Sequence, residues 1–142
     1  MVKRKFFAAL FSFALFLVSL ETHAGWTQLG SDINGEFTGD GEGGISLSSD
    51  GSTVAIGAIR NDANGNESGH VRVYRYDATS STWTQVGQDI DGVRELDWLG
   101  QSVSLSSDGS TIAIGAPAPN DQERVLIYSY DVTSSSWTQV GQ

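Results

Sequence analysis

The chain has 142 residues, no cysteine and a formal net charge of −9. A surface this acidic repels the phosphate backbones of DNA and RNA, which excludes nucleic acid as a partner. Without cysteine the fold has no disulfides, so its stability must come from a well-packed core.

The N-terminus has the layout of a secretory signal peptide. A basic start at residues 3–5 is followed by an apolar run over residues 6–20, and Thr22 and Ala24 place small residues before a cleavage site. A membrane span needs about 20 apolar residues, and this run has 15, which favours a cleaved signal over an anchor. The sequence therefore predicts a secreted, extracellular protein with no membrane span once residues 1–24, expected to be helical, are removed.

Internal repetition organises the rest of the chain. ISLSSDGSTVAIGA, from Ile45, returns as VSLSSDGSTIAIGA from Val103 with twelve of fourteen positions identical. YDATSSTWTQVGQ, from Tyr76, returns from Tyr130 with eleven of thirteen identical. The phrase WTQLG or WTQVG occurs three times, at spacings of 57 and then 54 residues. A period of this length is typical of solenoids, propellers and other repeat arrays.

Each repeat is predicted to hold four short antiparallel strands. An N-terminal strand, beginning at Trp26 and lying outside the first sheet, and a linker fill residues 25–44, the first repeat covers 45–92 and the second covers 93–142. Short apolar alternations bounded by Gly, Asp and Ser indicate strands, and the Asp-Gly pairs suit tight hairpins. The predicted strands are 45–48, 53–58, 70–77 and 83–88 in the first repeat, and 103–106, 111–116, 124–131 and one from 137 in the second.

The strands are predicted to be covered on both faces. Val71 and Val73 alternate with Tyr74 and Tyr76, and a strand that is apolar on both faces is normally covered on both sides. Gly57 leaves one face of its strand bare, which permits close approach of a neighbouring sheet. The pattern therefore predicts an all-β fold made of two tandem four-stranded blades of a β-propeller. A linear β-solenoid or a sandwich is the alternative.

Three phrases of the second repeat resemble a known family. LGQSV at 99–103, DG at 108–109 and IGAP at 114–117 are similar to the FG-GAP repeat of the integrin α-subunit propeller. The first repeat departs from it, with Glu42 in place of the glycine of LGQSV and Ile59 in place of the proline. Together with the signal-like N-terminus and the lack of a catalytic motif, the resemblance predicts a secreted, non-catalytic propeller module for extracellular binding or adhesion, with an extracellular protein or glycan as partner.

Two other functions stay open, because a repeat fold is a weak guide to function. The chain is then either a fragment of a secreted propeller enzyme, such as a hydrolase or lyase, whose active site lies outside it, or a truncated product without activity. Sequence beyond Gln142 with a non-repeat domain or clustered His and Asp residues would favour the enzyme.

Calcium binding is not implied where the family commonly has it. The connection Ser49–Ser52 is too short to encircle an ion that takes six to eight oxygens. Asp62, Asn64 and Asn66 alternate in another loop and form a second calcium candidate. The second repeat lacks this pattern, and Asn and Asp are ordinary loop residues, so a turn is favoured and no cofactor is predicted.

No catalytic residue is predicted. His70 is the one histidine after the signal, arginine replaces it in the second repeat, and alone it makes neither a metal site nor a triad. Asp89 and Asp91, like Asp32 and Asn34 before them, recur between units, where a turn between blades is favoured over a metal clip.

Two further kinds of site are predicted from tryptophan and asparagine. Trp83 and Trp137 share one repeat position and are expected to pack in the outer part of each blade. Trp98 does not recur and is the better candidate for an exposed aromatic contact. Asn66 begins Asn-Glu-Ser, which makes it the candidate N-glycosylation site.

Two repeats are too few to close a propeller, which uses four to eight blades. The 118 residues after the signal hold two repeats, and repeat units bury their faces against neighbours, so a bare apolar face is expected at each end. Trp26 begins a strand of the fourth type, yet the last repeat already has one at Trp137. We therefore expect either further blades beyond Gln142 or self-association of several copies.

Overall fold

The computed structural model describes residues 25–119 and 123–141, and these residues form two antiparallel sheets without a helix. The first sheet comprises β1 (Ile45–Leu47), β2 (Thr53–Ala58), β3 (His70–Asp77), β4 (Thr82–Gln85) and β5 (Ile90–Asp91). The second comprises β6 (Ser102–Leu105), β7 (Thr111–Ala116), β8 (Arg124–Asp131) and β9 (Ser136–Gln139). The all-β prediction is confirmed. The predicted signal helix lies outside the described residues.

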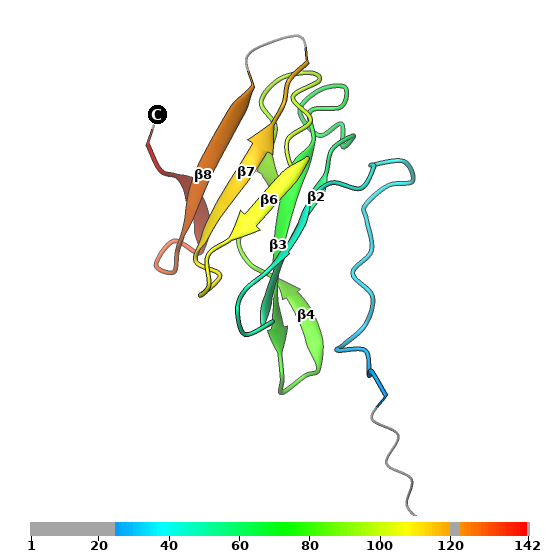
Figure 1. Cartoon of the computed structure of the whole chain (residues 1–142), viewed down its shortest axis with the longest axis vertical. Helices are drawn as coiled ribbons and strands as arrows, with labels where there is room; N and C mark the ends of the chain where they lie inside the picture. Colours follow the sequence, from blue (N-terminus) through cyan, green and yellow to red (C-terminus); the bar gives the residue numbers. More distant parts are fainter. Residues whose placement is uncertain (1–24, 120–122, 142) are drawn as a thin grey trace, which may run out of the picture.

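Both sheets follow the order of the chain. The first runs β1-β2-β3-β4, with β5 paired to the other end of β3, and the second runs β6-β7-β8-β9. Figure 1 shows the second sheet in front of the first, with their long strands in similar directions. Of the eight predicted strands in the repeats, β2, β3, β7 and β8 have the predicted bounds and the others differ by up to three residues.

The structure corrects the prediction at two places. One strand was expected over 83–88, but β4 ends at Gln85. Gly87 has a positive φ (+75°), which turns the chain away from the sheet. The chain then returns at Ile90, which pairs with β3. The prediction of a strand from Trp26 is wrong, because residues 25–29 form no strand and Trp26 is fully exposed. Residues 25–29 pair with no strand of either sheet.

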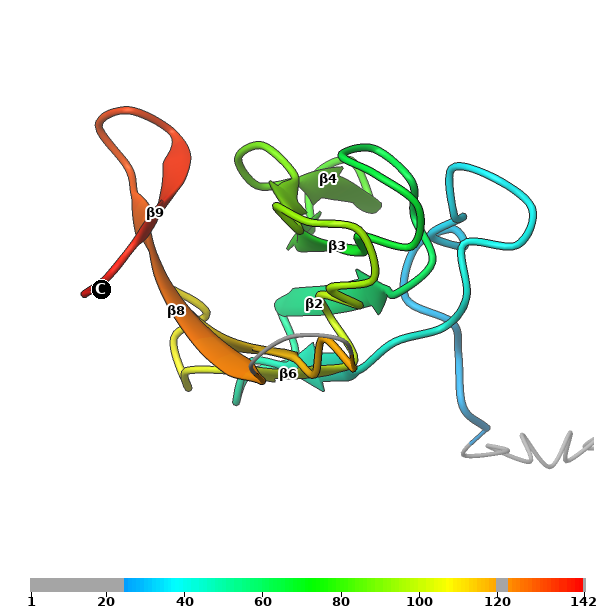
Figure 2. The same cartoon turned by 90° about the horizontal axis from the view of Figure 1, so that it is seen from above.

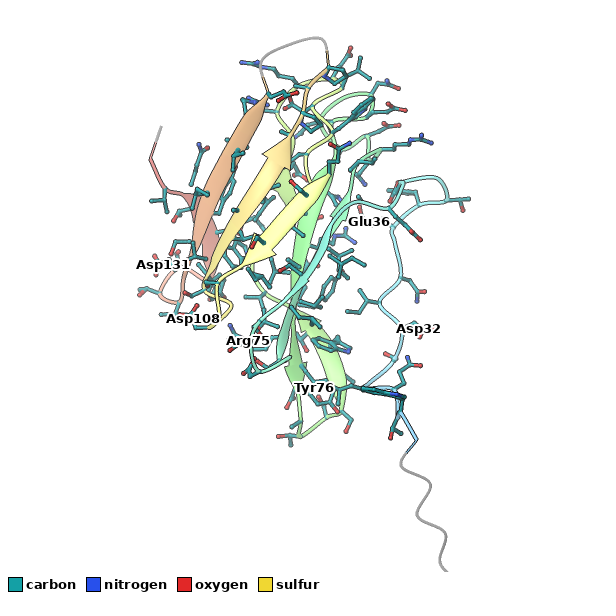
Figure 3. All side chains as sticks on the ribbon, in the orientation of Figure 1. Asp32, Glu36, Arg75, Tyr76, Asp108 and Asp131 are labelled. Atoms are coloured by element: carbon teal, nitrogen blue, oxygen red, sulfur yellow. The ribbon has the colours of Figure 1, made fainter. Side chains whose placement is uncertain are left out.

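Both β-hairpins at the Asp-Gly pairs are built by the same side chains. Asp50 Oδ1 accepts hydrogen bonds from Ser48 Oγ (2.6 Å) and Ser52 N (3.0 Å), and Gly51 adopts a positive φ of 70°. Asp108 does the same in the second sheet, with Ser106 Oγ at 2.6 Å and Ser110 N at 3.0 Å. These turns set the register between the first two strands of each sheet. Figure 3 shows Asp108 at the lower end of the second sheet.

The two sheets pack face to face along β2 and β6 and diverge toward β4 and β9 (Figure 2). The approach is closest at Gly57, where an added Cβ would lie 2.1 Å from Gly100 O. Gly44 N also donates to Gly100 O (2.8 Å), and Leu105 N donates to Ser46 Oγ (3.0 Å). Side chains from both sheets fill the space between them, and the buried set is Ala55, Val71, Val73, Val86, Ile90, Leu99, Ile112, Ile114, Ala116 and Trp137.

Candidate functional site

Five ionisable side chains gather beside the start of β3, and we call them the His70 cluster. They come from three separate parts of the chain. β3 supplies His70 and Arg72 on one face, the connection after β4 supplies Asp89 and β5 supplies Asp91. Glu36 reaches the same place from the N-terminal segment, which runs along this face of the first sheet (Figures 2 and 3).

Arg72 lies between two carboxylates of the cluster. Its Nε and Nη2 donate to Asp89 Oδ2 at 3.0 and 2.9 Å, and Nη2 also forms an ion pair with Glu36. Burial lowers the pKa of Arg72, but the hydrogen bonds that it donates to the Asp89 and Glu36 carboxylates outweigh burial and raise it. Gln85 Nε2 donates to the other oxygen of Asp89 at 2.5 Å. The arginine therefore fastens the N-terminal segment and the connection after β4 onto β3.

His70 is buried at the centre of the cluster, with its side chain 5% exposed. Its Nδ1 lies 4.0 Å from Glu36 Oε2 and 4.0 Å from Asp89 Oδ2 and has no hydrogen-bond partner. Burial and the charge of Arg72 lower its pKa, and the carboxylates oppose this shift without cancelling it. The shift favours the neutral form of the imidazole.

The two aspartates have opposite pKa shifts. For Asp89, burial raises the pKa, but hydrogen bonds from Arg72 and Gln85 outweigh burial and lower it. For Asp91, burial and the charge of Asp89 raise the pKa. Asp91 Oδ1 is buried without a hydrogen-bond partner, which explains why burial dominates there.

The cluster offers a possible ligand set for a metal ion, but its cation position is already filled. Glu36, His70 and Asp89 place one donor atom each within 4.8 Å of one another, and imidazole with carboxylates is a donor set that zinc accepts. Arg72 occupies both carboxylates, so a metal ion would have to displace the guanidinium. We interpret the cluster as an ion-pair clamp that fixes the loops of the first sheet.

A hollow of about 310 Å³ adjoins the clamp at the loop end of the first sheet. It lies between two loops and is lined by Glu36, Phe37, Thr38, Gly39, Asp40, Arg60, Asn61, Asp62 and Ala63. Phe37 is 72% exposed at its rim. Asp40 closes the first loop, since its Oδ2 accepts from Phe37 N (3.1 Å), and joins it to the second loop, since its carbonyl accepts from Arg60 N (2.7 Å).

Two side chains of the calcium candidate take part in hydrogen bonds, one within the loop and one to the connection after β5. Asp62 Oδ1 accepts from Glu67 N (2.7 Å), and Asn64 Nδ2 donates to Gly92 O (3.2 Å). The bond at Asp62 is of the kind that Asp forms in turns, and the bond at Asn64 joins the loop to the connection after β5. Asn66, the candidate glycosylation site, has an exposed position in the same loop.

The tryptophans differ from one another in burial and in hydrogen bonding. Trp137 is 3% exposed and donates from Nε1 to Val86 O (2.8 Å), so it packs between the sheets. Trp83 makes the corresponding bond to Leu29 O (2.8 Å) but is less buried. Trp98 was expected to be an exposed contact, yet it is half-buried and its indole N–H donates to Glu67 Oε2 (2.9 Å).

A buried acid in the second connection was missed by the sequence reasoning. Asp97 is 1% exposed, and its Oδ2 accepts from Val93 N (3.0 Å) and Arg94 N (3.1 Å). Its Oδ1 lies 2.6 Å from Arg124 Nη2, the arginine that replaces His70 in the second repeat. The replacement of His70 by an arginine in the second repeat was the available signal, because a partly buried arginine is normally paired with a nearby acid.

The other recurring acid between units is outside the cluster. Asp32 is exposed on the N-terminal segment (Figure 3) and accepts from Gln28 Nε2 at 2.7 Å. Asn34 is exposed as well. The structure therefore brings Asp89 and Asp91 into the cluster but leaves their counterparts in solvent.

Comparison with known proteins gives no family for this chain. No protein-family model and no curated protein sequence matches it. Within residues 25–119 and 123–141, no helix has the length and hydropathy needed to cross a bilayer.

Proposed function

We propose that this chain is a secreted, non-catalytic binding module, built from FG-GAP-like blades of a β-propeller, that holds an extracellular protein or glycan at the loop end of its first sheet. The observation that carries the proposal is the hollow between the loops at 36–40 and 60–63, with Phe37 exposed at its rim. Rigid sheets that present loops are a common scaffold for binding. The signal-like N-terminus supports an extracellular location.

The residues that line the hollow suit a ligand with hydrogen-bonding groups that also carries either an apolar face or a positive charge. Three carboxylates, from Glu36, Asp40 and Asp62, surround it, and Arg60 is the cation among its lining residues. An exposed aromatic ring beside hydrogen-bonding groups suits a sugar face or a basic side chain. The clamp at Arg72 limits the motion of the loop that carries Phe37, which reduces the entropy lost on binding.

The test is binding of the chain to broad arrays of glycans and surface proteins, followed by the variant Phe37→Ala. We expect the variant to lose affinity about tenfold, as removal of a contact worth roughly 1.4 kcal/mol would do. The matched control is Trp26→Ala, which removes a fully exposed aromatic ring that does not line this hollow. No binding on either array, or equal losses in the two variants, would contradict the proposal.

A further inference from the structure

The outer face of the second sheet carries the repeat counterparts of the residues with which the first sheet packs against the second. In the first sheet, Val71 and Val73 of β3 face the second sheet and are 0% and 1% exposed. Their repeat counterparts on β8 are Val125 and Ile127, which are 70% and 36% exposed. The same Thr-x-Ala-x-Gly series flanks each pair, at Thr53, Ala55 and Gly57 in β2 and at Thr111, Ala113 and Gly115 in β7.

The register of the pairings shows that these outer residues form one surface. Gly115 pairs with Val125, and Ala113 pairs with Ile127. In the adjacent strand, Ser102 pairs with Gly115. The surface therefore has small side chains beside two exposed aliphatic ones. Figure 1 looks onto it, and no described segment crosses it.

Part of the opposite half of the interface is exposed on the first sheet, beside the N-terminal segment that runs along the same face. In the second sheet, Val103 and Leu105 pack against the core between the sheets. Their counterparts on β1 are Ile45 and Leu47, which are 69% and 58% exposed. The two sheets thus share one interface, and residues at the positions of a second such interface are exposed on both outer faces.

We propose that the outer face of the second sheet binds the outer face of the first sheet in a second copy of this chain, head to tail. The interface between the two sheets already shows that faces of this composition fit each other. The contact joins two different surfaces, so repetition leads to a ring or an open chain rather than a symmetric dimer. Two complementary apolar faces of this kind are typical of association sites.

Docking in this way has a consequence for the N-terminal segment. Trp83 Nε1 donates to Leu29 O, just as Trp137 Nε1 donates to Val86 O, both at 2.8 Å. Residues 26–30 of the incoming copy would therefore overlap β9 of the first copy. β9 pairs with β8 along its length, whereas residues 26–29 belong to no strand. We expect residues 26–30 to move aside.

The experiment is sedimentation velocity of residues 25–142, which contain all nine strands, over a range of concentrations. We expect concentration-dependent association. Val125→Glu on the second sheet and Leu47→Glu on the first should each weaken it at least tenfold, because a bare charge would be buried. The matched control is Val132→Glu, at an equally exposed valine (78%) in the hairpin between β8 and β9, which should associate normally.

Mixing the two variants separates head-to-tail contact from a symmetric one. Val125→Glu keeps an intact first sheet and Leu47→Glu keeps an intact second sheet, so an equimolar mixture should form a 1:1 complex. A chain that stays monomeric at every concentration would overturn the proposal. Loss of association in Val125→Glu alone, with no complex in the mixture, would show a symmetric contact instead and would also overturn it. This outcome is independent of ligand binding at Phe37.

Discussion

At the scale of single residues, the aspartates of the turns carry the clearest electrostatic signal. Asp50 and Asp108 are solvent-exposed, yet hydrogen bonds from Ser48 and Ser106, together with those from the serine that follows each turn, lower the pKa of both to about 2. A charged carboxylate accepts these bonds better than a neutral one. Each turn therefore depends on the ionised state of its aspartate.

We predict an acid-dependent loss of stability from these two turns. A carboxyl whose pKa falls from 3.8 to about 2 on folding stabilises the protein above its unfolded pKa, and this contribution is lost as pH falls from about 4 to 2. Asp50→Asn and Asp108→Asn should each lower stability at pH 7 and flatten its decline between pH 4 and 2. Urea unfolding at several pH values measures this. Because the two turns have the same geometry, markedly different results for the two variants would contradict the argument.

At the scale of elements, the repeat explains which parts of the fold were predictable. The long strands β2, β3, β7 and β8 were predicted with their observed bounds, because apolar alternation and Asp-Gly turns occur twice. The short β5 was missed, since a pairing of two residues leaves no pattern in the sequence. The strand expected at Trp26 was inferred from its phrase, but a strand forms only where a partner edge is free, and the phrase does not encode that.

The His70 cluster could not be predicted for a related reason. Its members lie at residues 36, 70–72 and 89–91 and meet only through the register of β3 and β5 and the path of the N-terminal segment. His70 alone gave no sign of a site. The sequence did indicate that one face of β2 lacks a side chain at Gly57. It therefore predicted close approach of a neighbouring sheet at this residue, which is where the two sheets meet.

We predict that Gly57 and Gly115, although equivalent in the repeat, tolerate alanine very differently. A Cβ at Gly57 would meet the backbone of Gly100 at 2.1 to 3.0 Å, so the sheets would have to separate. Overpacking of this kind costs about 3 kcal/mol. A Cβ at Gly115 would meet mainly Ser102 Oγ, a side chain on the exposed face that can rotate away.

The measurement is urea unfolding of Gly57→Ala and Gly115→Ala, followed by tryptophan fluorescence at protein concentrations low enough to keep the chain monomeric. Gly115→Ala should change the free energy of unfolding by less than about 0.5 kcal/mol, because alanine suits a strand at least as well as glycine. Similar losses in both variants would mean that close approach of the sheets is not what Gly57 provides.

At the scale of the whole molecule, the contacts that hold the two sheets to each other differ in kind from those that hold the N-terminal segment to the first sheet. The sheets share one apolar core, which couples their unfolding. The segment before β1 is held to the first sheet mainly by polar contacts, including the Glu36–Arg72 ion pair and the bond from Trp83 Nε1 to Leu29 O. We therefore expect it to open locally while both sheets stay folded.

The last prediction tests this local opening with Glu36→Gln, which removes the ion pair to Arg72. A partly exposed pair contributes roughly 0.7 kcal/mol, so the indole N–H of Trp83 should exchange with solvent about threefold faster. The indole N–H of Trp137 makes the same bond inside the sheet interface and should not change. Exchange measured by NMR in Glu36→Gln, with Glu42→Gln on the same segment as the control, distinguishes the two sites. If both indoles accelerated together, the segment and the sheets would open as a single unit, and the local attachment inferred from the clamp would be wrong.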